Sequence, residues 1–227
     1  MTWAPLWLSL EIATIAMIVS LVVGTGLALL LRWRRLPVPD FVDALISAPL
    51  VLPPTVLGYY LLVALGPDSF AGRAWHAITG HTIIFTFTGA VIAATVGSLP
   101  LVVRSVRVGL DSIEPNLLAA ARTLGASPAR VLVTITLPLA APGLIAGAML
   151  AFARALGDYG MTQMVAGARI EGLWLDTTSP ASIYVYDQLV ANHEDAARTM
   201  AIVTTLVGVV ILYLTNRVTR RYYQAHV

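Results

Sequence analysis

The sequence contains no cysteine and no lysine. Without cysteine, the chain forms no disulfide and offers no thiol nucleophile or thiolate metal ligand. Without lysine, it lacks the Gly-Lys-Ser/Thr segment of a Walker A loop, which holds nucleotide phosphates, and it lacks the amine for Schiff-base chemistry. We therefore expect any ATP hydrolysis on which this protein depends to come from another chain.

Charged side chains are also scarce. They make up 11% of the 227 residues, whereas 58% of the residues are hydrophobic and the mean hydropathy is +0.81. This composition is typical of a membrane protein. The pI of about 9.2 does not indicate nucleic-acid binding, because the arginines stand in short clusters beside apolar segments. The four histidines are scattered over loops and the tail, so we expect no metal site.

Five long stretches lack formal charge, and each can cross a hydrocarbon core of ~30 Å, for which ~20 helical residues suffice. The sequence therefore predicts an all-α polytopic membrane protein, built as a single transmembrane domain over residues 1–227. The five predicted spans are 8–31, 44–66, 82–103, 131–156 and 199–216.

The distribution of arginine predicts the orientation of these spans. No basic residue precedes the first span, whereas Arg32, Arg34 and Arg35 follow it directly, so we expect the N-terminus outside and the C-terminus in the cytoplasm. The longest cytoplasmic loop is then 104–130, and the longest outer loop is 158–198. Ten arginines lie inside in this arrangement, and three lie outside, which are Arg73, Arg169 and Arg198.

The cytoplasmic loop has the signals of two short helices. Asp111 with Glu114 is typical of a capping box that starts the first helix, and Gly125 is expected to end it. Ser127 and Pro128 suit the start of the second helix. The apolar face of the first helix comprises Leu117, Leu118, Ala121 and Leu124, and the polar side carries Arg122 and Arg130.

This loop resembles the cytoplasmic coupling loop of ABC importer permeases. The family pattern is Glu-Ala-Ala, three residues, Gly, nine residues, Ile, one residue, Leu-Pro. Ala119 stands where the family usually has Glu, and the matching positions are Ala120, Ala121, Gly125, Ile135, Leu137 and Pro138. The resemblance implies that the loop docks on an ATPase, without the salt bridge that the Glu would supply. A surface helical hairpin between two spans is the alternative.

Small residues recur every four positions in the fourth predicted span, at Gly143, Gly147 and Ala151. Such a stripe lets another helix approach closely. The partner helix can belong to the same subunit or to a second copy across a dimer axis.

The second predicted span contains Pro49, Pro53 and Pro54, which should break it. In a membrane a broken helix is tolerated where protein or water satisfies the freed carbonyls, so we expect it to face the interior. Prolines are also more frequent in membrane helices generally. The candidate residues for a translocation pathway are Pro53, Pro54, Thr55, Thr86, Thr88, Ser98 and Thr162. Arg154 is expected near the outer end of its span, paired with Asp158 or in reach of water.

Three further segments resemble molybdate permease subunits: 48–62, 85–107 and 153–167. The resemblance implies the core of a type I ABC importer permease in the inner membrane, which translocates molybdate or tungstate. It also implies a homodimer, two copies of a cytoplasmic ATPase that bind ATP and Mg²⁺, and an external binding protein. The chain itself would carry no cofactor and no catalytic residue. A sulfate or thiosulfate permease of the same superfamily is the alternative, followed by a stand-alone secondary transporter.

Overall fold

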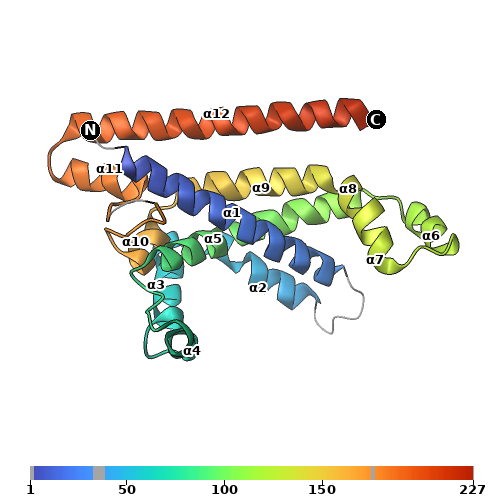
Figure 1. The fold of residues 1–227 in the computed structure, drawn as a ribbon, viewed down its shortest axis with the longest axis horizontal. Coiled ribbons are helices and arrows are strands. Elements are labelled where there is room, and N and C mark those ends of the chain that lie inside the picture. The colour runs from blue at the N-terminus through green and yellow to red at the C-terminus, as the bar shows by residue number, and fades with distance from the viewer. Residues whose placement is uncertain (1–2, 33–38, 175–176, 227) are drawn as a thin grey trace.

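The computed structural model describes residues 3–32, 39–174 and 177–226, and these residues form helices joined by short loops (Figure 1). The all-α expectation is confirmed for this part of the chain. An isolated antiparallel bridge joins Ile170 to Thr178. The elements are α1 (Ala4–Leu31), α2 (Pro39–Val51), α3 (Pro54–Leu65), α4 (Phe70–Thr79), α5 (Phe87–Asp111), α6 (Pro115–Thr123), α7 (Pro128–Val131), the π-helix η1 (Leu132–Thr136), α8 (Leu137–Leu139), α9 (Ala141–Leu156), α10 (Gly160–Ala166), α11 (Ala181–Val190) and α12 (Glu194–His226).

Three helices of the described residues are long and apolar enough to cross a membrane alone: α1, α5 and the Glu194–Leu214 part of α12. The predicted spans 44–66 and 131–156 are not straight helices. Each is a bent pair, with angles of 116° between α2 and α3 and 65° between the α7–α8 segment and α9. The third predicted span also differs, because α5 begins five residues after 82 and continues past 103 to Asp111.

Prolines explain both breaks. Pro53 has an extended conformation, with φ −54° and ψ 139°, and Pro54 is the first residue of α3. Since a proline lacks the N–H and disfavours a helical residue before it, α2 ends at Val51. In the second pair the break is at Ala140, and Pro142 in the first turn of α9 has no N–H to donate to the carbonyl of Pro138. One turn earlier, Pro138 cannot bond to the carbonyl of Thr134, and the turn before it widens into the π-helix η1.

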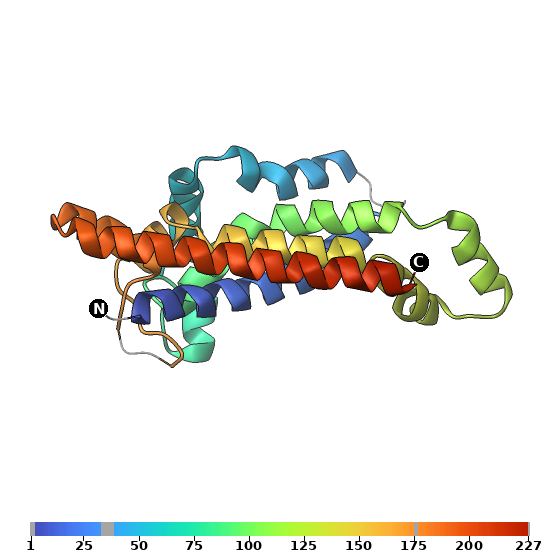
Figure 2. The ribbon, with the colours of Figure 1, turned by 90° about the horizontal axis from the view of Figure 1, so that it is seen from above.

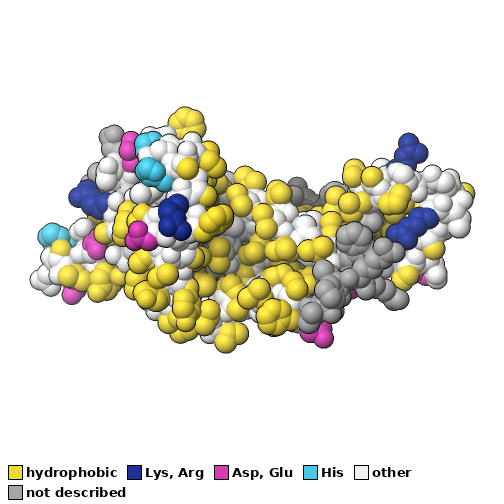
Figure 3. All heavy atoms as spheres, turned by 90° about the horizontal axis from the view of Figure 1, so that it is seen from below, with side chains coloured by type: hydrophobic (Ala, Val, Ile, Leu, Met, Phe, Trp, Pro, Cys, Tyr) yellow, Lys and Arg dark blue, Asp and Glu magenta, His cyan; other side chains and the backbone are white. Residues whose placement is uncertain are grey.

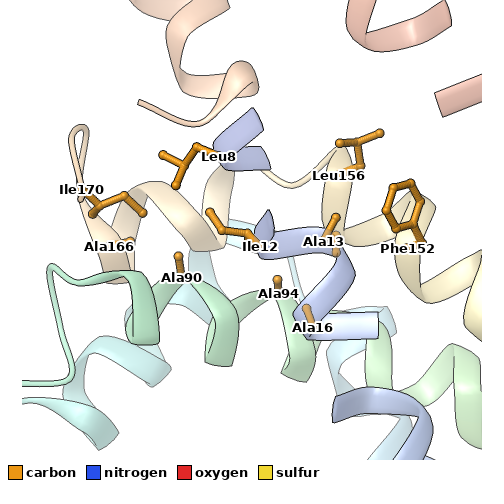
Figure 4. Close-up of a cluster of buried hydrophobic side chains, with 11 residues drawn as sticks. Leu8, Ile12, Ala13, Ala16, Ala90, Ala94, Phe152, Leu156, Ala166 and Ile170 are labelled. Atoms are coloured by element: carbon orange, nitrogen blue, oxygen red, sulfur yellow. The ribbon is translucent and has the colours of Figure 1, made fainter. Parts of the chain in front are cut away.

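Helices α1, α5 and α9 pack against one another and form the centre of the fold (Figures 1 and 2). Alanine, glycine and serine together make up most of the buried positions of these helices, which lets the backbones approach closely. Figure 4 shows the cluster nearer the N-terminus, where Leu8, Ile12 and Phe152 surround small side chains. A second cluster continues toward α6 and comprises Ala28, Val102, Val103, Val106, Leu110, Ile113, Ala140 and Ala151. Helix α12 runs outside this centre and contacts α11 and α9.

The ends of the long helices carry different elements. In Figure 1 the start of α1, together with α10 and α11, lies at one end of the molecule, and α6 and α7 lie at the opposite end. Figure 3 shows a broad band of hydrophobic side chains between these ends, while most of the visible charged side chains gather at the ends themselves. Such a band is what a protein in a bilayer presents to lipid.

Candidate functional site

The loop between α5 and α9 begins and ends where these two helices cross. Gly109 of α5 and Gly143 of α9 lie against each other, because a Cβ atom on Gly143 would stand 2.9 Å from the Cα of Gly109. A Cβ atom on Gly147 would meet Val102 at 3.3 Å. Ala151 is fully buried in the same contact region. The small stripe therefore packs against a helix of its own chain, not against a second copy.

Gly125 separates the two short helices of the loop. Its φ of +84° is left-handed, a conformation that glycine adopts without steric cost. The N–H of Gly125 donates to the carbonyl of Arg122, and the N–H of Ala126 donates to that of Ala121, at 3.0 and 3.1 Å. These two bonds form a Schellman motif, which satisfies the last carbonyls of α6. Beyond it, Ser127 caps α7 by accepting a bond from the N–H of Arg130 at 3.3 Å.

The start of α6 differs from the sequence expectation. Asp111 is the last residue of α5, and Glu114 occupies the N-cap position of α6 without a side-chain capping bond, so there is no capping box. Helix α6 begins instead at Pro115, whose fixed φ suits a first helical residue. The carboxylate of Glu114 instead accepts a bond from the amide of Asn116 at 3.3 Å.

None of the residues of α6 is buried, and all but the half-buried Leu118 and Ala121 are exposed. Leu124 is 88% exposed and Leu117 is 46% exposed, although both are apolar. Leu118 alone among the α6 leucines packs against the second core cluster. Ala119, Ala120 and Arg122 are also exposed, whereas Ile135 and Leu137 are half-buried and Pro138 is exposed. An exposed apolar patch on a short, well-capped helix is typical of a protein-docking surface.

Two arginines link neighbouring helices at the end of the bundle that carries α6. Arg32 donates from Nη1 to the carbonyl of Leu110 at 3.0 Å and so caps the last turn of α5. Arg107 of α5 forms an ion pair of 2.7 Å with Asp43 of α2. Arg34 and Arg35, on which the predicted orientation also rests, lie outside the described residues.

The candidate pathway residues do not form one surface. Pro53, Pro54 and Thr55 are exposed at the bend between α2 and α3. Thr86 caps α5, accepting a bond from the N–H of Gly89 at 3.3 Å, and Thr88 is the half-buried second residue of that helix.

Ser98 and Thr162 are occupied by other partners. Ser98 is fully buried, and its Oγ lies 2.9 Å from the Oγ of Ser20, so that it links α5 to α1. It also donates to the carbonyl of Ala94 at 2.7 Å. A buried hydroxyl with these partners is not available to a passing anion, and we withdraw Ser98 from the pathway candidates.

Thr162 belongs to a polar cluster at the turn from α9 to α10. Its backbone N–H and its Oγ1 both donate to Oδ2 of Asp158, at 2.9 and 2.8 Å. Oδ1 of the same carboxylate accepts from Nη1 of Arg154 at 3.0 Å. The Oγ of Ser182 donates to the backbone carbonyl of Asp158 at 2.7 Å, which adds α11 to the cluster. The spacing of Arg154 and Asp158 indicates their pairing, but no sequence signal predicts that Thr162 completes it.

Comparison with known proteins identifies the family. Residues 12–225 match the model of the family described as "Binding-protein-dependent transport system inner membrane component". The chain belongs to this family. The match includes the exposed α6–α7 segment, and the chain is a multi-pass inner-membrane protein.

Several molybdenum transport permease proteins are similar over most of the chain. The molybdenum transport system permease protein ModB of Escherichia coli K12 is 39% identical over 218 residues, which cover 96% of this chain and 93% of that protein. ModB of Haemophilus influenzae is 38% identical, with 97% and 96% covered. The putative molybdenum transport system permease protein YvgM of Bacillus subtilis is 39% identical, with 81% and 79% covered.

Solved structures show the same fold at lower identity. A chain of the MetNI methionine ABC transporter in an inward-facing conformation superposes with a TM-score of 0.74, at 20% identity, over 96% of this chain and 94% of that chain. A chain of a bacterial ABC transporter involved in alginate import gives a TM-score of 0.69 at 15% identity, with 96% and 78% covered. The fold is therefore that of an ABC importer permease.

Proposed function

We propose that this chain is the membrane-spanning permease subunit of an ATP-driven importer for molybdate or tungstate. The observation that carries the proposal is the 39% identity to a molybdenum transport permease across 96% of the chain. The exposed α6–α7 loop supports it, because an ATPase can bind to such a loop of a permease. The chain hydrolyses no ATP itself, since it has no lysine for a phosphate-binding loop.

The working complex contains two copies of this chain, two copies of a cytoplasmic ATPase that bind ATP and Mg²⁺, and an external protein that delivers the anion. The N-terminus lies outside, and the α6–α7 loop lies in the cytoplasm. The opposite placement of the N-terminus and α6 in Figure 1 supports this orientation, as does the excess of inside arginines. Five spans result if each bent helix pair counts as one.

Energy reaches the pathway through the crossing of α5 and α9. The loop leaves α5 two residues after Gly109 and leads back into α9 just before Gly143. Because backbone meets backbone at this crossing, a pull on α6 moves both helices together and does not bend one against the other. Closure of the ATPase dimer therefore draws the paired loops inward and shifts the pathway from inward-facing to outward-facing.

The pathway itself runs along polar groups near the helix breaks. A dianion that crosses hydrocarbon needs hydrogen-bond donors, because an unsolvated charge is costly there. The exposed Thr55, with Pro53 and Pro54 at the bend, and Thr86 and Thr88 at the start of α5 are the candidates that keep accessible surface.

A pair of variants at Leu124, the exposed residue that directly follows α6, tests the ATPase contact. Leu124→Asp places a charge on the apolar patch, whereas Leu124→Ala only shortens the side chain. Because Leu124 is 88% exposed, neither change should alter the unfolding temperature of the purified chain. We expect Leu124→Asp to lower permease-stimulated ATP hydrolysis about tenfold or more and Leu124→Ala to lower it less, since charge in a buried docking contact costs a few kcal/mol. Equal stimulation by both variants and the wild type would show that α6 does not dock the ATPase.

A further inference from the structure

Arg154 lies deeper in the bundle than its place near the end of α9 indicates. Its Nη2 stands 3.8 Å from the position that a Cβ atom on Gly97 would take. Gly97 follows the first residue of α5 by ten positions, which corresponds to ~15 Å along the helix. The side chain of Met161 fills the space over Gly97, and the guanidinium of Arg154 lies at ordinary contact distance from the same point, beside α5.

The surroundings of Arg154 are unlike those of a lipid-facing residue. The side chain is 28% exposed, while its partner Asp158 is 1% exposed. Leu150, one turn before it on α9, is exposed, and so is Gly157, which directly follows the last residue of α9. An ionisable group at membrane depth is costly toward lipid and is found facing a bundle interior or a water-filled cavity. The exposed part of the guanidinium therefore faces the pathway side of the bundle.

The guanidinium has unused donors at this place. It carries five N–H groups, and one of them, on Nη1, bonds to Asp158 among the contacts of the described residues. The carboxylate of Asp158, in contrast, is fully engaged by Arg154 and the two donors of Thr162. The carboxylate of Asp158 is therefore fixed in place and bonds to one N–H of the Arg154 guanidinium, which leaves the other N–H groups free to bind a ligand.

We propose that Arg154 binds the tetrahedral oxyanion as it passes through the membrane and that Asp158 weakens this contact enough for release. This inference rests on the proposed function and adds the residue that holds the substrate. A planar guanidinium binds an oxyanion through two parallel N–H bonds, and the adjacent carboxylate neutralises most of its charge. The dianion is therefore bound weakly at Arg154 and can dissociate again.

A second arginine, Arg104, lies on the same helix face as Gly97, nearer the end of α5. Arg104 follows Gly97 by seven residues, so it lies on the same face of α5, about 10 Å closer to the coupling loop. It is exposed and has no ion-pair or hydrogen-bond partner within the described part of the chain. An anion that leaves Arg154 toward the cytoplasm would next meet this guanidinium.

The test measures initial uptake of radiolabelled molybdate against its concentration, in proteoliposomes that contain the assembled transporter. Arg154→Lys keeps the charge and the ion pair but loses the planar fork, and we expect its apparent KM to rise about tenfold. The double variant Arg154→Gln/Asp158→Asn leaves no unpaired buried charge, and we expect wild-type thermal stability with a similar rise. Asp158→Asn alone should lower both the apparent KM and the maximal rate. Arg217→Gln, which removes an exposed arginine of α12, is the matched control and should change nothing.

A wild-type KM and rate in the double variant would show that the pair is only structural and would overturn the inference. If the double variant does not fold, Arg154→Lys decides, because an unchanged KM in that variant overturns it equally. An unchanged KM in Asp158→Asn would overturn the role given to the carboxylate. Failure of the wild-type assembly to take up molybdate would overturn the proposed function and this inference with it. If the wild-type assembly takes up molybdate and the Arg154 variants keep its KM and rate, this inference is overturned while the proposed function stands.

Discussion

Gly109 and Gly143 meet backbone to backbone at the point where α5 and α9 cross. A Cβ atom on Gly143 would lie 2.5 Å from the carbonyl oxygen of Ser105 and 2.9 Å from the Cα of Gly109. Both distances are below the contact limit for real side chains, and backbone atoms cannot swing away as the end of a side chain can. We therefore expect the two helices that flank the α6–α7 loop to move as one unit.

Substitution of Gly143 should therefore separate the two helices. We expect Gly143→Val to destabilise the purified chain by about 3 kcal/mol or more, because overpacking already costs about 1–3 kcal/mol where side chains can yield. Thermal unfolding in detergent measures the change. Gly26→Ala is the control, since nothing lies within 4 Å of a Cβ atom there. An unfolding temperature of Gly143→Val equal to that of the control would show that the helices do not cross as described.

Gly125 tests the role of the loop without a steric clash. Nothing lies within 4 Å of a Cβ atom at this position, so its substitution acts only through the left-handed backbone. Gly125→Val should uncouple ATP hydrolysis from uptake, because a β-branched residue strains at φ +84°. Gly125→Asn should stay close to wild type, since asparagine tolerates this conformation. Both variants need equal expression in the membrane, and normal uptake by Gly125→Val would remove the loop conformation from the mechanism.

Much of the loop was predictable because its signals are local. A glycine after an apolar turn, and Ser127 followed by Pro128, each specify one backbone conformation or one cap within a few residues. The missing capping box has the opposite cause. Asp111 and Glu114 fit the spacing, but α5 continues to Asp111 because Leu110 and Ile113 bury themselves in the core between α1 and α9. Tertiary packing decided where that helix ends.

The angles of the helix bends and the accessibility of the candidate pathway residues could not be predicted from the sequence alone. The prolines predict where the second span breaks, but the angle of 116° depends on how α3 packs against α10 and α5. Ser98 carries the same hydroxyl as a pathway residue would, and only its burial against Ser20 assigns it to helix packing. The depth of Arg154 was hidden for a similar reason, because Gly97, which lies beside its guanidinium, is in a different helix.

The link between Ser20 and Ser98 can be measured by a double-mutant cycle with Ser20→Ala, Ser98→Ala and the double variant. We expect a coupling energy of about 0.6 kcal/mol, which is the average for interhelical hydrogen bonds in a membrane. Uptake should stay unchanged in all three variants, because neither hydroxyl reaches the pathway. A selective loss of uptake in Ser98→Ala, with stability preserved, would return Ser98 to the pathway.

The most direct measurement is oxyanion uptake by proteoliposomes that contain this chain, its ATPase and its binding protein. Radiolabelled molybdate is supplied alone and in competition with tungstate or sulfate, with and without ATP. The account predicts ATP-dependent molybdate uptake that tungstate blocks and sulfate does not. ATP-dependent uptake of sulfate alone would contradict the substrate, and molybdate uptake by this chain without the ATPase would contradict the mechanism.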